Sequence, residues 1–238
     1  MNIALIGYGK MGQAIEALAL AAGHSISHRI GIHNTDELQQ ISSATTDVAI
    51  EFTHPEAAYA NVMHCLQQGV PVVCGTTGWL EQKAEVEAWV QAHGGAFFWA
   101  SNFSIGVNLF FQVNQYLARL MEKVPGYEVQ IEEIHHIHKK DAPSGTAITL
   151  AEGILQELSR KKGWANELKE DPETLPIISI REAEVPGTHS IRWQSATDLL
   201  ELKHEAFSRQ GFASGALQVA QWLPGRTGVF GMDDFLSL

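Results

Sequence analysis

A single segment, residues 133–147, gathers most of the side chains in this chain that could do chemistry. It reads Glu133-Ile-His-His-Ile-His-Lys-Lys-Asp-Ala-Pro-Ser-Gly-Thr-Ala147. His135, His136, His138, Lys139 and Lys140 are all cationic or can become so, and like charges at this spacing repel each other. Fold stability alone does not explain such crowding. We expect a bound anion to compensate for it, and we expect a lysine among histidines to be a better proton donor near neutral pH.

The same segment leads into a predicted helix. Pro143 and Ser144 are residue types common at helix starts, and an apolar periodicity continues to Leu158. A helix N-terminus presents unpaired N–H groups and a partial positive charge, so Gly145 and Thr146 are predicted to hold a carboxylate or phosphate. A simpler interpretation stays open for Ser144, which would then only cap the helix.

A glycine motif near the N-terminus indicates a second kind of site. Gly7-x-Gly9-x-x-Gly12 lies between an apolar run and an Ala/Leu-rich helix that ends near residue 22. The dinucleotide fingerprint has this position: its first glycine permits a tight turn, its second lets the backbone approach a pyrophosphate, and its third allows close helix packing. We therefore predict nucleotide binding here. The predicted contacts are Gly7, Tyr8, Gly9, Lys10, Met11 and Gly12.

The type of nicotinamide cofactor stays open. An acidic residue at the end of the second strand usually grips the ribose hydroxyls of NAD, but Gly31 or His33 takes that place here. Lys10, together with Arg29 or His33, could instead meet a ribose phosphate. The sequence is thus compatible with NADPH, with NADH or with both.

Strands alternate with helices through the first hundred residues, which predicts an α/β fold with an N-terminal Rossmann-type, doubly wound parallel sheet. Beyond residue 104 the pattern predicts a C-terminal α+β domain with a mostly antiparallel sheet. We expect the first domain over 1–103, the second over 104–214, and a C-terminal segment, 215–238, that returns to the first. The expected strands are 1–6, 26–32, 47–52, 70–74, 96–100, 127–136, 177–180, 189–195 and 199–206, and the further helices 55–68, 80–93, 105–123, 144–158 and 212–223.

Further loops follow predicted strands at the edge where parallel sheets bind ligands. They contain Phe52-Thr53-His54-Pro55, Cys74-Gly75-Thr76-Thr77-Gly78-Trp79 and Ala100-Ser101-Asn102-Phe103. Each loop alone is explained by an ordinary strand-to-helix turn. Together with the glycine motif, they predict contacts to the nicotinamide end of a dinucleotide.

Composition excludes several classes of function. A net charge of −11 and the absence of a long Lys/Arg block argue against nucleic-acid binding. Neither a basic leader nor a run of eighteen apolar residues occurs, so we expect a cytoplasmic protein without membrane contact. Cys65 and Cys74 lack metal spacing and are expected to be reduced, buried thiols.

No metal is predicted. His136-x-His138 could chelate an ion, but no third ligand stands at a matching offset. The remaining histidines are interpreted as surface or satisfied core residues. They are His24, His28, His54, His64, His93, His189 and His204.

These motifs together resemble the 4-hydroxy-tetrahydrodipicolinate reductase (dihydrodipicolinate reductase) family. The resemblance spans essentially the whole chain, and its most specific part is His135-His136-x-x-Lys139-x-Asp141-Ala-Pro-Ser-Gly-Thr146. It is supported by the glycine motif, Gly75-Thr-Thr-Gly78, Asn102-Phe-Ser104 and Phe212-Ala-Ser-Gly-Ala216.

The resemblance implies roles for individual residues. The residues that would contact the cofactor are Gly75, Thr76, Thr77, Ala100, Ser101, Asn102 and Phe103. His135 would do acid/base work and Lys139 would donate the proton, while His136, Ser144, Gly145 and Thr146 would bind a dicarboxylate substrate. It also implies reduction of 4-hydroxy-tetrahydrodipicolinate with NAD(P)H in lysine and diaminopimelate biosynthesis. The second domain would bind substrate and form a homotetramer.

Chemistry supports this interpretation, because reducing a carbon–carbon double bond conjugated to an imine needs a hydride, a proton and anchors for two carboxylates. In an unbroken strand His135 and Lys139 would lie roughly 13 Å apart. We therefore expect the chain to turn after His136. Two other functions stay open: a dehydrogenase acting on an amino-acid semialdehyde or alcohol, and a nucleotide-sensing module without catalysis. No role is predicted for His138 or Lys140.

Overall fold

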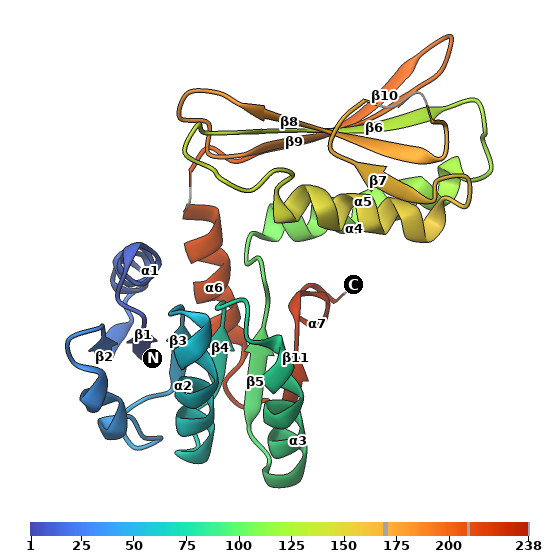
Figure 1. The fold of residues 1–238 in the computed structure, drawn as a ribbon. Coiled ribbons are helices and arrows are strands. Elements are labelled where there is room, and N and C mark those ends of the chain that lie inside the picture. Colours follow the sequence, from blue (N-terminus) through green and yellow to red (C-terminus); the bar gives the residue numbers. More distant parts are fainter. Residues whose placement is uncertain (169–170, 209, 238) are drawn as a thin grey trace. The chain divides into compact units, whose positions relative to one another are not determined.

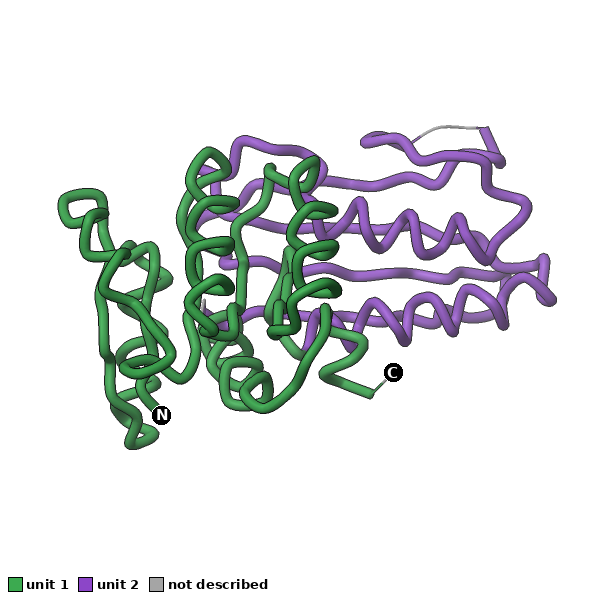
Figure 2. Tube along the Cα trace, turned by 90° about the horizontal axis from the view of Figure 1, so that it is seen from below, with its two compact units in different colours: residues 1–105, 210–238 green, residues 106–209 purple. Residues whose placement is uncertain are grey.

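The computed structural model describes residues 1–168, 171–208 and 210–237 and divides into two compact units (Figures 1 and 2). One unit comprises Met1–Ile105 and Gln210–Leu238, and the other comprises Gly106–Arg209. The chain thus leaves the first unit two residues later than predicted and returns five residues earlier. Residues 169–170 and 209 of the predicted second domain, and residue 238 of the returning segment, lie outside the described residues.

The first unit contains a six-stranded sheet in which every strand pair is parallel. Its order is β11-β5-β4-β3-β1-β2, so β1 lies inside the sheet and the chain builds outward on both sides of it. This is the doubly wound arrangement that the sequence predicts, and the Rossmann-type fold is confirmed. The strands are β1 Asn2–Ile6, β2 Ser25–Ile30, β3 Val48–Glu51, β4 Val72–Cys74, β5 Ala96–Trp99 and β11 Gly228–Phe230.

Helices cover both faces of this sheet because alternate side chains of each strand point to opposite faces. Ile3 and Leu5 of β1 lie in one apolar cluster with α1 and α6, whereas Ala4 and Ile6 lie in another with α2 and α3. The helices are α1 Lys10–Ala21, α2 Pro55–Gln67, α3 Lys83–His93, α6 Gln210–Trp222 and α7 Met232–Leu236, with 3-10 turns at Thr35–Gln40 and Leu80–Gln82.

The second unit contains a five-stranded mixed sheet with the order β10-β9-β6-β8-β7. β9 pairs antiparallel with β10 and with β6, while β8 pairs parallel with β6 and with β7. The antiparallel pairings are the longer ones, with seven residue pairs each against five and three. The strands are β6 Glu128–His135, β7 Gly163–Ala165, β8 Thr174–Arg181, β9 Thr188–Gln194 and β10 Leu199–Glu205.

Two helices, α4 Ile105–Met121 and α5 Gly145–Glu157, lie along one side of the second sheet (Figure 1). Ile131 of β6, Ile177 of β8 and Trp193 of β9 pack against them in one apolar cluster. The chain passes through α5 between β6 and β8, and such a crossover returns it in the same direction. The β6–β8 pair is therefore parallel.

Two strands were not predicted, β7 and β11. Each has three residues, too few to show a periodicity of two, and β7 lies in a polar segment. Among the described residues no helix combines the length and apolarity that crossing a membrane requires.

Candidate active site

The glycine motif forms the tight turn between β1 and α1. Gly7 has φ +97°, and a β-carbon there would lie 1.9 Å from the carbonyl oxygen of Phe52. A β-carbon on Gly12 would lie 2.4 Å from the carbonyl oxygen of Gly7. Gly9, the N-cap residue of α1, is different, because a β-carbon there would meet nothing within 4 Å. Gly7 and Gly12 are thus required by the fold, whereas Gly9 leaves open space at a helix N-terminus.

A pocket of about 410 Å³ lies beside this turn. Its walls come from the residues that follow β1, β2 and β3, at the carboxyl edge of the sheet, where doubly wound folds bind nucleotides. Apolar side chains and exposed backbone at the glycine turn suit an adenosine and its phosphates, so the residues present fit a dinucleotide. The lining is Ile6, Gly7, Tyr8, Gly9, Ile30, Gly31, Ile32, Thr35, Leu38, Phe52, Thr53, His54, Ala57 and Asn61.

Arg29, one predicted partner for a ribose phosphate, is already engaged. Its Nε lies 2.7 Å from Oε1 of Glu16, and the Tyr8 hydroxyl donates to the same carboxylate. Hydrogen bonds from Arg29 and then Tyr8 lower the pKa of Glu16. Arg29 therefore has a carboxylate partner, whereas Lys10 is exposed at the start of α1.

The loop after β4 is held by its own contacts. A β-carbon on Gly75 would lie 2.0 Å from the Phe52 ring. Thr76 is buried, its Oγ1 accepts from the Thr53 amide at 2.8 Å, and its carbonyl oxygen accepts from the indole of Trp99 at 3.0 Å. Gly75 and Thr76 thus fix two neighbouring loops together. Thr77 is exposed and free of such packing.

In the loop after β5 some residues are likewise packed inside the fold while others are exposed. Ala100 and Phe103 are buried, and the Phe103 ring packs on Phe52 with centroids 5.5 Å apart. The Asn102 side chain accepts from the Ser104 amide at 2.8 Å. Ser101 is exposed. Both loops end at the carboxyl edge of the sheet, as predicted, and their contacts to a cofactor stay a prediction.

The two thiols are buried, as expected. Burial raises the pKa of Cys65 to about 12, and it also raises the pKa of Cys74, whose thiol donates to the buried carboxylate of Glu51 at 3.1 Å. Thiols held protonated in this way are poor nucleophiles. Cys65 and Cys74 therefore contribute to the packing of this unit and not to its chemistry.

In the second unit the reactive segment starts at the end of β6. His135 is buried, and its Nδ1 hydrogen-bonds to Oε2 of the fully buried Glu133. Arg181 of β8 donates to the other oxygen, Oε1, at 2.9 Å. Burial alone raises the Glu133 pKa, but hydrogen bonds from His135 and Arg181 outweigh it and bring the pKa to about 2. Glu133 is therefore ionised at neutral pH.

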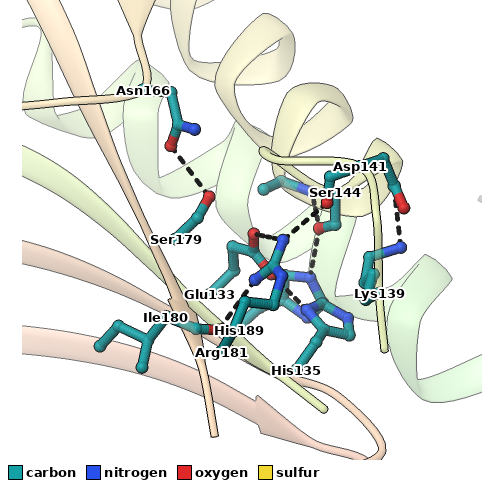
Figure 3. A network of polar contacts seen from close by, with 11 residues as sticks. Glu133, His135, Lys139, Asp141, Ser144, Asn166, Ser179, Ile180, Arg181 and His189 are labelled. Carbon is teal, nitrogen blue, oxygen red and sulfur yellow. Dashed lines mark hydrogen bonds and ion pairs between the residues drawn. The ribbon is translucent and has the colours of Figure 1, made fainter. Parts of the chain in front are cut away.

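His189 of β9 completes this buried cluster (Figure 3). Its ring lies edge-on to that of His135, with centroids 5.1 Å apart, and its Nε2 lies 3.0 Å from Oγ of Ser144. Burial first, and the nearby His135 second, lower the pKa of His189 to about 3. His189 is the satisfied core residue that the sequence suggests, yet it lies among the predicted site residues.

The chain turns after His136, as the spacing predicts. The Lys139 amide donates to the His136 carbonyl at 3.1 Å, and the Lys139 ammonium lies 2.8 Å from Oδ2 of Asp141. That hydrogen bond lowers the pKa of Asp141. His138 is exposed, and its Nε2 lies 3.7 Å from Oε1 of Glu184. The sequence predicts a bound anion that compensates for the positive charge of this segment. Carboxylates of the chain itself already offset much of that charge.

The predicted anion site lies at the start of α5. Ser144 caps the helix, since its Oγ accepts from the Ala147 amide at 3.2 Å, so the predicted helix start is confirmed, while a contact of Ser144 with substrate stays a prediction. Gly145 and Thr146 take the first helical positions, whose N–H groups have no partner inside a helix. A β-carbon on Gly145 would meet nothing within 4 Å, which leaves room beside those groups.

His136 stands apart from the buried histidines. It is half-buried, and its Nδ1 is covered but has no hydrogen-bond partner among the described residues. A buried polar atom without a partner is costly, and a ligand would satisfy it. The predicted role of His136 in binding substrate stays a prediction.

Sequence reasoning assigned no role to Glu133, Arg181 or His189. A strand period of two places Glu133 on the same face as His135, which is a readable signal. Arg181 and His189 are distant in sequence, and only the register of the strands places them next to the segment. In that register His135 lies opposite Arg181, and Glu133 lies opposite His189.

A metal ion is an alternative occupant of this cluster. Possible ligand atoms of Glu133, His135 and His189 lie within 4.8 Å of one another. The Arg181 guanidinium already lies on the carboxylate and would repel a cation. The absence of a metal therefore stays our prediction.

The buried His189 predicts an acid-sensitive fold. Its folded pKa of about 3 lies below the ordinary value of 6.5, so between these values the unfolded chain binds a proton that the folded chain does not. Stability should therefore fall as the pH drops from 7 to 5, with about 2 kcal/mol from this group. Thermal melts of His189→Gln should show a smaller fall in Tm over this range than wild type.

The matched control is His33→Gln, which changes an exposed histidine. It should keep the acid dependence of wild type. An equal fall in Tm for His189→Gln and wild type would show that His189 does not carry the effect. Glu133 does not interfere at pH 5, because its own window runs from about 4.5 to 2.

Comparisons with known proteins agree with this architecture. The family model for the dihydrodipicolinate reductase N-terminus matches residues 1–103, and the model for its C-terminus matches residues 106–236. The 4-hydroxy-tetrahydrodipicolinate reductase of Christiangramia forsetii is 47% identical, with 100% of this chain and 98% of that protein covered. The enzyme of the same name from Neisseria gonorrhoeae is 37% identical, over 94% of this chain and 84% of that protein.

A solved structure has the same fold. It is the dipicolinate-bound dihydrodipicolinate reductase from Paenisporosarcina sp. TG-14, with a TM-score of 0.75, 24% identity and 97% of each chain covered. The family models together account for nearly the whole chain, and the curated relatives match it at full or nearly full length. The resemblance in the motifs is thereby confirmed, and the chain belongs to the dihydrodipicolinate reductase family.

Proposed function

We propose that this chain is an NAD(P)H-dependent 4-hydroxy-tetrahydrodipicolinate reductase, which forms tetrahydrodipicolinate by way of dihydrodipicolinate in lysine and diaminopimelate biosynthesis. The names of its full-length relatives support this activity. The dipicolinate bound to the structurally similar enzyme supports a cyclic dicarboxylate as the substrate class. The residues of the second unit supply the chemistry that such a substrate needs.

The observation that carries the proposal is the arrangement around His135. An ionised Glu133 holds one ring nitrogen, and the same segment carries Lys139 and then the start of α5. A proton donor and a preformed carboxylate site thus come from fifteen consecutive residues. A dehydrogenase for semialdehydes or a nucleotide sensor has no need of this combination.

Each group has a defined task in the reaction. The N–H groups of Gly145 and Thr146 donate hydrogen bonds to a substrate carboxylate, and the unpartnered Nδ1 of His136 offers a further hydrogen bond. Lys139 delivers a proton to the carbon next to the one that is reduced, and His135 assists the transfer. A bound nicotinamide supplies the hydride.

The first unit would hold NADPH, NADH or both. Gly9 leaves space for a pyrophosphate at the start of α1, and the adjoining pocket accepts an adenosine. The pairing of Arg29 with Glu16 removes one argument for a ribose phosphate. This pairing weakens the case for a preference for NADPH, and we expect the enzyme to use NADH.

The test is consumption of NADPH and of NADH with freshly generated hydroxy-tetrahydrodipicolinate. The proposal predicts turnover that depends on this substrate, and the two KM values decide the cofactor preference. Absence of turnover with both cofactors would contradict the proposed function.

We further propose a homotetramer in the cytoplasm, built through the second sheet. Leu199 and Leu200 of β10 are 48% and 40% exposed, an apolar edge that a partner subunit would cover. Light scattering should give about four times the chain mass of 26.1 kDa. A monomer at micromolar concentration would refute this assembly.

A further inference from the structure

Glu133 and Arg181 form a largely buried pair that has no reaction step of its own in the proposed chemistry. Glu133 is fully buried, and both of its oxygens are engaged, one with His135 and one with Arg181. Buried pairs of this kind add little stability over well-packed apolar residues. The pair is better explained by what it does to its neighbours.

We propose that Glu133 and Arg181 are positioning residues, which fix the tautomer of His135 and tether the Lys139 turn to it. The proposal rests on the proposed roles of His135 and Lys139. Neither member of the pair needs to touch substrate, because each would act through a neighbouring residue.

The tautomer follows from the identity of the groups. A carboxylate only accepts hydrogen bonds, so Nδ1 of His135 must carry the hydrogen that Glu133 accepts. In the neutral ring, Nε2 is then the nitrogen with a lone pair. A β-carbon on Gly187 would lie 3.0 Å from this Nε2, so a glycine at this position leaves room beside the nitrogen. His135 thus presents Nε2 as its working atom.

The tether is formed by a single nitrogen of Arg181. Nη2 donates to Glu133 Oε1 at 2.9 Å and to the carbonyl oxygen of Asp141 at 2.6 Å, while Nη1 donates to the carbonyl of Ile180 at 2.8 Å. Asp141 in turn holds the Lys139 ammonium. One guanidinium therefore links the carboxylate behind His135 with the loop that carries Lys139, and Figure 3 shows these contacts together.

The variant Glu133→Gln makes this geometry testable. Arg181 can only donate, so it selects the amide oxygen of the new side chain and turns the NH₂ group toward His135. Nδ1 must then accept, and the hydrogen of the neutral ring moves to Nε2. A wrong tautomer in a histidine held by a carboxylate costs as much as about 10⁴ in rate in a well-studied protease triad.

The first readout is the tautomer itself, measured by ¹⁵N NMR of histidine-labelled protein without substrate. Wild type should show His135 protonated at Nδ1, and Glu133→Gln should show it protonated at Nε2. The matched control is Glu132→Gln, the same change at the next position of β6, where the side chain points to the other face of the sheet. The control should keep the wild-type tautomer.

The second readout is kcat. Glu133→Gln should lower it by at least about 10²-fold, and Glu132→Gln should leave it within about twofold. In a His135→Ala background, adding Glu133→Gln should have no further effect, because the carboxylate acts through the ring. The double variant Glu133→Gln/Arg181→Met lets the amide turn over and should restore the Nδ1–H tautomer of His135, whereas kcat should stay below that of wild type because the tether to the Lys139 turn is lost.

The outcomes separate this proposal from the proposed function. An Nδ1–H tautomer in both wild type and Glu133→Gln would overturn the positioning role, as would an equal loss of kcat with and without His135. If wild type does not turn over substrate, the proposed function fails, while the tautomer measurement still decides the positioning role. Thermal melts of all variants identify any that do not fold, and the double variant, which removes both charges, guards against that result.

Discussion

Replacing Lys139 by alanine is expected to lower kcat by at least about 100-fold, with the Kd values for NADH and NADPH changed by less than about twofold. A positioned general acid contributes about 10²–10⁴ in rate, and the cofactor is predicted to bind in the other unit. Steady-state kinetics with hydroxy-tetrahydrodipicolinate, together with fluorescence titration of the cofactors, measures both quantities.

Lys140→Ala is the matched control, because it removes an adjacent, exposed lysine. It should keep wild-type kcat. Loss of the Lys139 ammonium also frees Asp141, whose carboxylate is exposed enough to be hydrated, so folding should be little affected. Wild-type kcat in Lys139→Ala would refute the role of this lysine as proton donor.

Replacing Gly9 by valine is expected to weaken binding of both cofactors by at least about tenfold while leaving Tm nearly unchanged. A β-carbon at Gly9 meets nothing within 4 Å, so the folded chain accommodates it. A bulky side chain would still fill the space in which the backbone at the helix start approaches a pyrophosphate. Isothermal titration with NADH and NADPH, beside a thermal melt, measures the two effects.

Gly12→Val provides the contrast. Its β-carbon would lie 2.4 Å from the Gly7 carbonyl oxygen, so this variant should lose stability as well as cofactor binding. If Gly9→Val bound cofactor as wild type does, the glycine turn would not be the pyrophosphate site.

Local sequence signals predicted the parts of the site that are continuous in the chain. Strand length and spacing predicted the turn after His136, and residue type predicted the Ser144 cap, because both depend on neighbours within a few residues. The glycine turn and the parallel sheet were predicted for the same reason. Short strands such as β7 and β11 gave no periodicity and depend on pairing with longer neighbours.

The remaining parts depend on register between distant strands. Arg181 and His189 reach Glu133 and His135 only because β8 and β9 both pair with β6 in a particular register. The same limit explains why Arg29 was expected to be available for a phosphate. Its partner, Glu16, lies on α1, and nothing local in the sequence shows that the two side chains meet.

The central claim is that a hydride from the cofactor and a proton from this chain reduce a cyclic dicarboxylate. Wild-type enzyme, hydroxy-tetrahydrodipicolinate and NADPH or NADH deuterated at both C4 positions test it most directly, with mass spectrometry of the product. The account predicts tetrahydrodipicolinate that carries a single deuterium from the cofactor, formed far more slowly by Lys139→Ala. Product without cofactor-derived deuterium, or no product with either cofactor, would contradict it.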